Sequence, residues 1–371
     1  MDFIQLVNKL DKGYLSINKN LCSWIRYHKS SCHRCLEACP QKSIRLDKEI
    51  IVDDEQCDGC GICLAICPTG VFQPTKEGDR EIISWIKGHL EQKTDKILRI
   101  QCKKEDQNKK GILYVSCLGR LTENILLGAF AYGAEEIELR KGNCPECPWH
   151  TGEHIFRTTL NLTHFLAQLV GIDPTRIREV ESFPEDNSVS FHTEVSLSRR
   201  GLFRAFKGKA LKKASELLPE RTAKIPGNQW AHYDNPRRRL LLEILQRFPR
   251  LYPVTVKVSE DLPFADLEIS NDCLGCNVCE TLCPPGAIER KINDGRVIIS
   301  FDPRLCTNCY VCQGVCWVKA IKNKEPLYLT QLFTQGKREL IQLEERVCKF
   351  CGTHLLGVRG DYCPSCLNKR N

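Results

Sequence analysis

Two segments, one near each end of the chain, carry the apolar and polar pattern of a β-hairpin. KSIRLDKEIIVDDEQ runs apolar on both sides of a polar turn at Asp47-Lys48. GAIERKINDGRVIISFD does the same around Asn293-Asp294-Gly295. Apolar runs on both sides of such a turn are typical of paired antiparallel strands. The sequence therefore predicts the same small β unit twice.

The middle of the chain has a different pattern. ILRIQC, GILYVSC and EEIELRKGNC are apolar runs that each end in a cysteine, and TENILLGAFAYGA between the last two favours a helix. Strands that alternate with helices predict a small α/β unit with a mainly parallel sheet. Such sheets place their sites at the strand ends, which is where these cysteines fall.

Residues 186–260 contain no cysteine and carry more charge. SRRGLFRAFKGKALKKASELLP has apolar residues near helical spacing with basic residues between them, so it predicts a basic helix. NPRRRLLLEILQRF predicts a second helix, which we expect to pack on the later cysteine-rich module. Each helix could dock a partner, with an ordinary solvated basic face as the alternative. Contact with a membrane surface is a weaker alternative.

The composition narrows the class of protein. The chain has 371 residues and 24 cysteines, a length that suggests two to four domains. Its first twenty residues lack the apolar region of a secretory signal, and no run of about 18 apolar residues predicts a membrane span. We therefore expect a cytoplasmic protein whose thiolates bind metal, with disulfides as the alternative. The net charge of +8 fits an acidic protein partner better than nucleic acid.

The cysteines divide into six groups of four with none left over, which favours metal centres because four thiolates hold one metal ion or one cluster. Three groups have the spacing Cys-x2-Cys-x2-Cys-x3-Cys: CDGCGICLAICP from Cys57, CLGCNVCETLCP from Cys273 and CTNCYVCQGVCW from Cys306. Three cysteines on a tight loop can reach three corners of one cube. The fourth, turned away by the start of a helix, reaches the neighbouring cluster. Trp317 stands where the first two runs have proline.

The first group departs from this spacing. Lys29 stands where a cysteine should lie three residues before Cys32, and Cys22 is the free candidate. We interpret this group as an expanded loop that keeps four ligands. The alternative is a three-iron or three-thiolate site with Cys22 as a buried core residue.

At this point the chain resembles the 2×4Fe–4S bacterial-type ferredoxins, over about residues 22–75 and 266–325. The crossover rule for such runs then predicts four 4Fe–4S sites. Site 1 comprises Cys22, Cys32, Cys35 and Cys67, and site 2 comprises Cys39, Cys57, Cys60 and Cys63. Site 3 comprises Cys273, Cys276, Cys279 and Cys316, and site 4 comprises Cys283, Cys306, Cys309 and Cys312.

The middle segment VSCLGRLTENILLGAFAYGAEEIELRKGNCPECPWHTG resembles the delta (iron–sulfur) subunit of methyl-viologen-reducing hydrogenase, over about residues 97–183. The resemblance implies a 2Fe–2S cluster on the middle site: Cys102, Cys117, Cys144 and Cys147. It also implies electron transfer between a hydrogenase or formate dehydrogenase and a heterodisulfide-reductase-like module. The last pair is tighter than the family pattern, so structural zinc, another 4Fe–4S cube or no metal stay as alternatives. We expect His150 and His154 to be surface residues.

The last group, CKFCGTHLLGVRGDYCPSC, forms two Cys-x2-Cys knuckles. This tail site comprises Cys348, Cys351, Cys363 and Cys366. It predicts a zinc ribbon or a rubredoxin-like iron centre, with zinc favoured because it is commoner in short terminal knuckles.

The predicted fold class is α+β ferredoxin-like modules flanking a small α/β domain, with a zinc-ribbon or rubredoxin-like tail. The expected domains are a ferredoxin module (1–78), the α/β domain (79–185), a basic helical linker (186–260), a second ferredoxin module (261–330) and the tail (331–371).

The predicted function is cytoplasmic electron transfer in an anaerobe, between partners such as a hydrogenase, a dehydrogenase, a heterodisulfide-reductase-like subunit or a ferredoxin. We find no dinucleotide, P-loop or haem motif and predict no catalytic residue. The alternatives are a redox-sensing regulator that binds RNA or DNA, and a reductase with its own substrate site at the middle cysteines.

Overall fold

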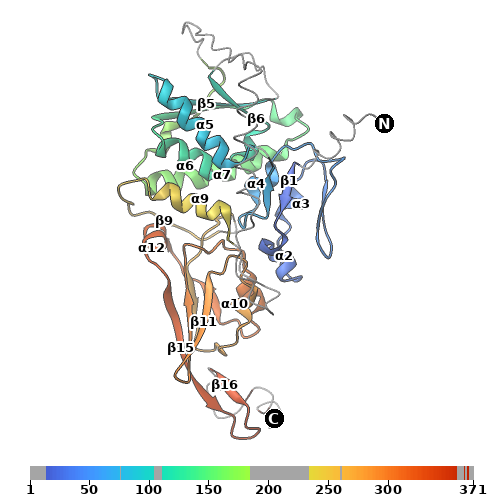
Figure 1. Cartoon of the computed structure of the whole chain (residues 1–371), viewed down its shortest axis with the longest axis vertical. Helices are drawn as coiled ribbons and strands as arrows, with labels where there is room; N and C mark the ends of the chain where they lie inside the picture. The colour runs from blue at the N-terminus through green and yellow to red at the C-terminus, as the bar shows by residue number, and fades with distance from the viewer. Residues whose placement is uncertain are drawn as a thin grey trace, which may run out of the picture. The chain divides into compact units, whose positions relative to one another are not determined.

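The fold was analysed in a computed structural model that describes residues 14–75, 77–103, 111–183, 234–259 and 261–356, together with Cys363 and Cys366 (Figure 1). The expected basic helix within SRRGLFRAFKGKALKKASELLP lies outside these residues. The described elements form two ferredoxin-like modules, a parallel α/β unit and a short C-terminal knuckle.

The first module is built from two antiparallel strand pairs. The expected hairpin is confirmed: β2 (Ile44–Leu46) pairs with β3 (Ile50–Val52). A second pair joins β1 (Leu15–Ile17) to β4 (Phe72–Pro74) and so brings the two ends of the module side by side. The helical turns between them are η1 (Lys19–Leu21), α2 (Ser23–Arg26), α3 (Arg34–Ala38) and α4 (Ile62–Ile66).

The second module repeats this plan. β11 (Ile288–Asn293) and β12 (Arg296–Phe301) form the other expected hairpin. Its turn residues Asp294 and Gly295 both have positive φ, 49° and 70°, which suits the right-handed twist of the strands. The module also contains β10 (Leu267–Ile269) paired with β13 (Ile321–Asn323), and the helices α10 (Val278–Leu282) and α11 (Val311–Val315).

One detail of the cysteine motif differs from the expectation. In α3, α4, α10 and α11 the third cysteine of each run lies inside the five-residue helix, and the fourth follows its last residue. The fourth cysteine is therefore turned away at the end of a helix and not at its start. The helix lasts little more than one turn, because the chain must leave it to carry the fourth thiol to the other site of the module.

The middle unit has four parallel strands in the order β6-β5-β7-β8, which confirms the expected parallel sheet. The central strand β5 (Ile97–Cys102) has Leu98 and Ile100 fully buried, as expected for a strand covered on both faces. The other strands are β6 (Ile112–Val115), β7 (Glu136–Arg140) and β8 (Ile177–Glu179). The helical segments are α5 (Asp79–Gln92), η2 (Leu118–Arg120), α6 (Glu123–Ala131), η3 (Cys144–Glu146), α7 (Thr151–Leu169) and η4 (Pro174–Arg176).

Helix α9 (Pro236–Leu245) packs on residues of the later module, as predicted, and also on the middle unit. It lies against α6 of the middle unit, and its Leu241 and Ile244 share a buried core with Leu127 and Leu166. The same core also takes in residues that flank the second module, including Phe264 and Leu329. Within the described part of the expected linker, α9 is thus an internal element that joins the middle unit to the second module.

The segment after residue 330 also differs from the expectation of a separate tail. β15 (Arg338–Val347) pairs with β12, so it extends the hairpin of the second module before it pairs with β16 (His354–Leu356). β14 (Leu327–Tyr328) pairs with β9 (Thr255–Val256) and leads into α12 (Leu329–Thr334). The four-cysteine knuckle is therefore attached to the second module by a continuous sheet.

Candidate iron–sulfur and metal centres

The thiols of site 1 lie together although they come from three parts of the first module. Burial raises the pKa of the Cys22 thiol to about 11, opposed by N–H groups of Ile25 and Trp24 and reinforced by the nearby Cys67 and Cys32 thiols. Burial and the thiols of Cys67, Cys22 and Cys32 likewise raise the pKa of Cys35. The structure therefore brings Cys22 to the other three cysteines, as a four-ligand site requires.

Site 2 gathers Cys39 with the three cysteines that follow the hairpin. Burial raises the pKa of the Cys60 thiol to about 11, and the neighbouring Cys39 and Cys57 thiols add to the rise. All four thiols, Cys63 included, line one cavity of about 340 Å³. Cys39 thus lies with the second run of its module and not only with its own, which is the crossover arrangement.

In the second module, too, the fourth cysteine of each run lies with the other run. Burial raises the pKa of the Cys306 thiol to about 12, opposed by the N–H of Asn308 and reinforced by the Cys283 thiol. Cys316 in turn lies near Cys273, whose pKa is raised by burial. Sites 3 and 4 therefore each take their fourth thiol from the other run.

A repeated backbone contact suits these thiols to be metal ligands. The N–H group two residues after the cysteine points to its sulfur at Cys57, Cys60, Cys273, Cys306 and Cys309. Gly59, Gly275 and Asn308 supply some of these N–H groups from positive φ values of 65°, 64° and 51°. N–H donors around a thiolate stabilise its negative charge and that of a bound cluster. The donor sets therefore fit iron–sulfur clusters.

The four middle cysteines also converge. Cys102 ends β5, Cys117 lies shortly after the parallel strand β6, and Cys144 and Cys147 bound the turn that follows β7. All four line one cavity of about 40 Å³. Because the carboxyl ends of parallel strands meet at one edge, the topology alone assembles this site.

The middle site has the same N–H to sulfur contacts as the ferredoxin sites. The N–H of Gly119 donates to Cys117 Sγ at 3.3 Å, and the N–H of Trp149 donates to Cys147 Sγ at 3.4 Å. Burial raises the pKa of the Cys117 thiol to about 12, opposed by the Gly119 N–H and reinforced by the Cys102 and Cys60 thiols. His150 and His154 are exposed. The residues present fit a cluster or metal ion held by four thiolates.

The middle site lies directly against site 2. Cys117 packs with Ile62 and Ala65 of α4, and Cys60 lies beside the same cluster of residues. Trp149 Nε1 donates to Asp58 Oδ2 at 3.1 Å, from the loop that carries site 2. The first ferredoxin module therefore meets the middle unit through the cysteine-bearing loops of both.

The other side of the first module contacts the second module. Arg26, buried at the end of α2, donates from Nη1 to the carbonyl of Thr281 at 3.1 Å. Tyr27 Oη donates to the carbonyl of Gly314 at 3.3 Å. Because α2 begins directly after Cys22, and Thr281 and Gly314 lie on α10 and α11, this contact joins the loop of site 1 to the helices of sites 3 and 4.

Two buried arginines of α9 were missed by the sequence interpretation, which treated the RRR run as a solvated or docking face. Arg237 forms an ion pair with Glu123, and it donates from Nη1 to the carbonyl oxygens of Leu64 at 3.2 Å and Cys67 at 3.1 Å. Arg238 lies over the ring of Phe264 at 4.3 Å from its centroid and donates to the carbonyl of Pro263. The local sequence gives no signal for this burial beyond Asn235, which caps the helix.

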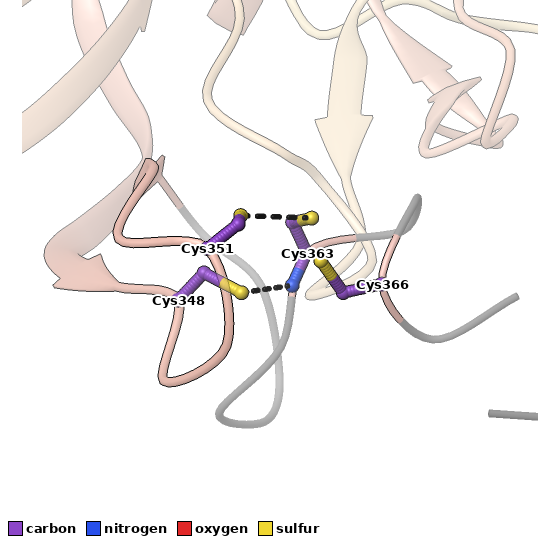
Figure 2. Close-up of side chains that lie close together, drawn as sticks. All are labelled: Cys348, Cys351, Cys363 and Cys366. Atoms are coloured by element: carbon purple, nitrogen blue, oxygen red, sulfur yellow. Dashed lines mark hydrogen bonds between the residues drawn. The ribbon is translucent and has the colours of Figure 1, made fainter. Parts of the chain in front are cut away.

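The tail cysteines form the tightest group (Figure 2). The four sulfurs of Cys348, Cys351, Cys363 and Cys366 all lie within 4.8 Å of one another, a separation that suits one ion. Burial raises the pKa of the Cys348 thiol, but N–H groups of Cys351, Cys363 and Phe350 outweigh it and lower the pKa to about 6. A thiol that loses its proton readily is prepared to bind a metal ion.

Two parts of the chain, residues 30–71 and 272–320, match the 4Fe-4S dicluster domain family. The chain is 40% identical to "Ferredoxin Fdx2" of Sorangium cellulosum over 57 residues, which are 14% of this chain and 52% of that protein. It is 35% identical to a "Ferredoxin-like protein in nif region" of Rhizobium leguminosarum bv. trifolii over 54 residues, 13% of this chain and 78% of that protein. The chain thus spans about half the length of the first relative.

The paired four-cysteine runs, their hairpins and these matches define an iron–sulfur protein with two ferredoxin-type modules. The chain belongs to the 4Fe–4S dicluster ferredoxin family. Ferredoxin-type iron–sulfur domains suggest an electron-transfer role. None of the helices that the structure describes is both long and apolar enough to cross a membrane.

Proposed function

We propose that this chain is a multi-cluster electron-transfer subunit with four 4Fe–4S clusters at sites 1–4 and a fifth centre, a 2Fe–2S cluster, at the middle site. Each bound cluster would take up and release electrons. The tail site would hold one zinc ion, or a rubredoxin-type iron, and stabilise a segment too short to build a core of its own. The observation that carries the proposal is the proximity of the Cys117 and Cys60 thiols.

The contacts between units support one continuous path. The middle site adjoins site 2 at Cys60, and sites 1 and 2 exchange their fourth cysteines within one module. Arg26 and Tyr27 then join the loop of site 1 to the helices of the second module. The order middle site, site 2, site 1 and second module follows from these contacts. This order favours a single conduit and not the alternative in which the two modules serve separate partners.

Contacts of α9 fix the units around the path in place. Arg237 ties α9 to the end of α4 at Cys67, and α9 shares its apolar face with the middle unit and the flanks of the second module. Rigid packing keeps the separations between sites constant, which an electron path requires. We assign the donor to a hydrogenase or formate dehydrogenase and the acceptor to a heterodisulfide-reductase-like or other reductase subunit in the cytoplasm of an anaerobe. This assignment rests on the resemblance of the middle segment.

The test is the content of iron, acid-labile sulfide and zinc per chain in anaerobically purified protein, with EPR spectra of the reduced sample. The proposal expects about 18 iron, about 18 sulfide and about one zinc. The matched control is the double variant Cys102→Ser and Cys144→Ser, which should keep about 16 iron and lose one EPR component. A preparation with mostly zinc and little iron after reconstitution would contradict the electron-transfer proposal. About 16 iron in both proteins would contradict the 2Fe–2S centre alone.

A further inference from the structure

Arg238 is a buried cation of α9 with one donor group left unused. The residue is 4% exposed, its Nη2 donates to the carbonyl of Pro263, and its guanidinium lies over the ring of Phe264. Its Nη1 is also buried and has no hydrogen-bond partner among the residues that the structure describes. A buried donor without a partner costs free energy, which indicates a role for the charge that packing alone does not explain.

The loop of site 4 lies against the segment that Arg238 binds. Asn308, two residues after Cys306, donates from Nδ2 to the carbonyl of Leu262 at 2.9 Å. Leu262 directly precedes Pro263, so the loop and the guanidinium contact neighbouring carbonyl groups of one segment. Arg238 and Cys306 also lie close enough for their charges to interact. A buried cation of α9 therefore lies beside a ligand of site 4.

The acidic groups around this cation already have other partners. Glu123 acts on Arg238 but forms its ion pair with Arg237, and Asp266, which acts on the same site 4 thiol, pairs with Arg338. Burial lowers the pKa of Arg238 to about 10, and Glu123 and the thiol oppose that fall, so the guanidinium stays protonated at neutral pH. The ion pairs of the described residues therefore leave the charge of Arg238 uncompensated.

The remaining charges near site 4 do not cancel this one. Arg26 of the first module, also 4% exposed, lies near Cys283 and donates to the carbonyl of Thr281, two residues earlier in the chain. The buried carboxylate of Asp302 accepts from Arg304 at both oxygens, from Nε at 2.9 Å and from Nη2 at 2.7 Å. Arginines from two separate elements thus lie beside site 4.

A cation next to a cluster favours the reduced form of that cluster. A reduced cluster carries one more negative charge than an oxidised one, and the net charge nearby is one of the factors that set the reduction potential. A buried charge acts more strongly than an exposed one because water and salt screen it less. We propose that Arg238 raises the reduction potential of site 4 and so sets how electrons divide between site 4 and the other clusters. This inference rests on the proposed function, because it takes site 4 to hold a 4Fe–4S cluster.

The test is a redox titration of the full-length protein with dithionite, followed by EPR. Each oxidised cluster takes up one electron from dithionite, which is oxidised to sulfite, and no bond to the cluster is broken. Arg238→Gln should shift the electron distribution away from site 4 at least tenfold, which is a fall of about 59 mV in the midpoint potential of one EPR component. A Cys309→Ser variant identifies that component, because it removes a ligand of site 4 and should abolish or change the same signal.

Arg239→Gln is the matched control, because it removes the next arginine of the same helix, whose side chain is 54% exposed. This variant should leave every midpoint potential unchanged. The fall in Arg238→Gln should be the same at low and high salt, as a buried charge requires. Arg238→Lys keeps the positive charge and should restore most of the potential, which a role in packing alone would not predict.

A second variant without the charge separates the possible failures. Arg238→Met introduces no polar group that needs a partner, and it should lower the potential of site 4 as Arg238→Gln does. Wild-type protein without reducible clusters would overturn the proposed function itself. Intact clusters with wild-type midpoint potentials in either uncharged variant would overturn only the role of Arg238. Loss of the site 4 iron in both variants would assign Arg238 a structural role and would overturn the inference as well.

Discussion

Gly152 lies between Cys117 of the middle site and Ile62 of the first ferredoxin module, and a single methyl group there should disrupt the middle site. A Cβ atom at residue 152 would lie 2.5 Å from Cys117 Sγ and 3.1 Å from Cδ1 of Ile62. Ordinary contacts begin near 3.4 Å, so the sulfur or the helix must move by about 0.9 Å. The sulfur is also fixed from another side by the Gly119 N–H at 3.3 Å. Metal ligands keep their distances to within about 0.2 Å, so this displacement is large for a ligand.

Two opposing terms set the effect of Gly152→Ala on stability. Alanine is favoured over glycine in a helix by about 1 kcal/mol, whereas overpacking costs about 1–3 kcal/mol. We expect a net loss of up to about 2 kcal/mol in the free energy of unfolding. The variant should also lose about two iron atoms per chain if the middle site holds a 2Fe–2S cluster. Sites 1–4 should keep their iron.

Gly88→Ala is the matched control because it makes the same chemical change in a helix without a clash. Gly88 lies in α5, and a Cβ atom there would meet nothing within 4 Å. This variant should be more stable by about 1 kcal/mol and should keep all of its iron. The assays are thermal unfolding under anaerobic conditions, iron and sulfide content, and EPR of the reduced protein. Equal iron content and equal spectra in both variants would refute the assignment of Cys117 as a ligand.

Three further changes test other parts of the structure. Glu123→Gln leaves Arg237 buried without its counter-charge and should cost about 3–5 kcal/mol in denaturant unfolding. Burial favours a raised pKa at Glu123, but Arg237 outweighs it and lowers the pKa below the ordinary 4.5. The pair's contribution to the free energy of unfolding should therefore be complete above pH 4.5 and be lost as the pH falls through the lowered pKa. The variant should lack this pH dependence. Equal acid sensitivity of the wild-type protein and the variant would contradict the role of the pair. Cys22→Ser should convert site 1 to a three-iron cluster or empty it, seen as lost iron and a changed EPR spectrum, whereas a core role for Cys22 predicts unchanged iron. Cys363→Ser should remove about one zinc or iron per chain and leave the clusters intact, so loss of cluster iron would show that the tail is not independent.

The ferredoxin modules could be predicted because the relevant constraints are local. Cysteines separated by two residues on a tight loop reach one centre whatever the rest of the chain does, and a polar turn between apolar runs sets a hairpin. For this reason β2–β3 and β11–β12 appeared as expected, and Cys39 lies with Cys57 and Cys60. The parallel middle sheet followed in the same way from the alternation of strands and helices.

Other features depend on contacts between residues far apart in the chain, which no local pattern encodes. The helix α9 was predicted, but the place of Arg237 was not, because its arginines look like a solvated face, whereas Glu123 and the carbonyls at the end of α4 hold Arg237 inside. Likewise, β15 joined the sheet of the second module because β12 offered an unpaired edge.

The sequence by itself thus determined the grouping of the cysteines and the two ferredoxin modules, since close spacing restricts where a thiol can reach. Tertiary structure alone decided that Cys117 lies beside Cys60 and that Cys276 is exposed. These are outcomes of packing, in which burial of apolar faces brings separate loops together at separations that spacing along the chain does not set.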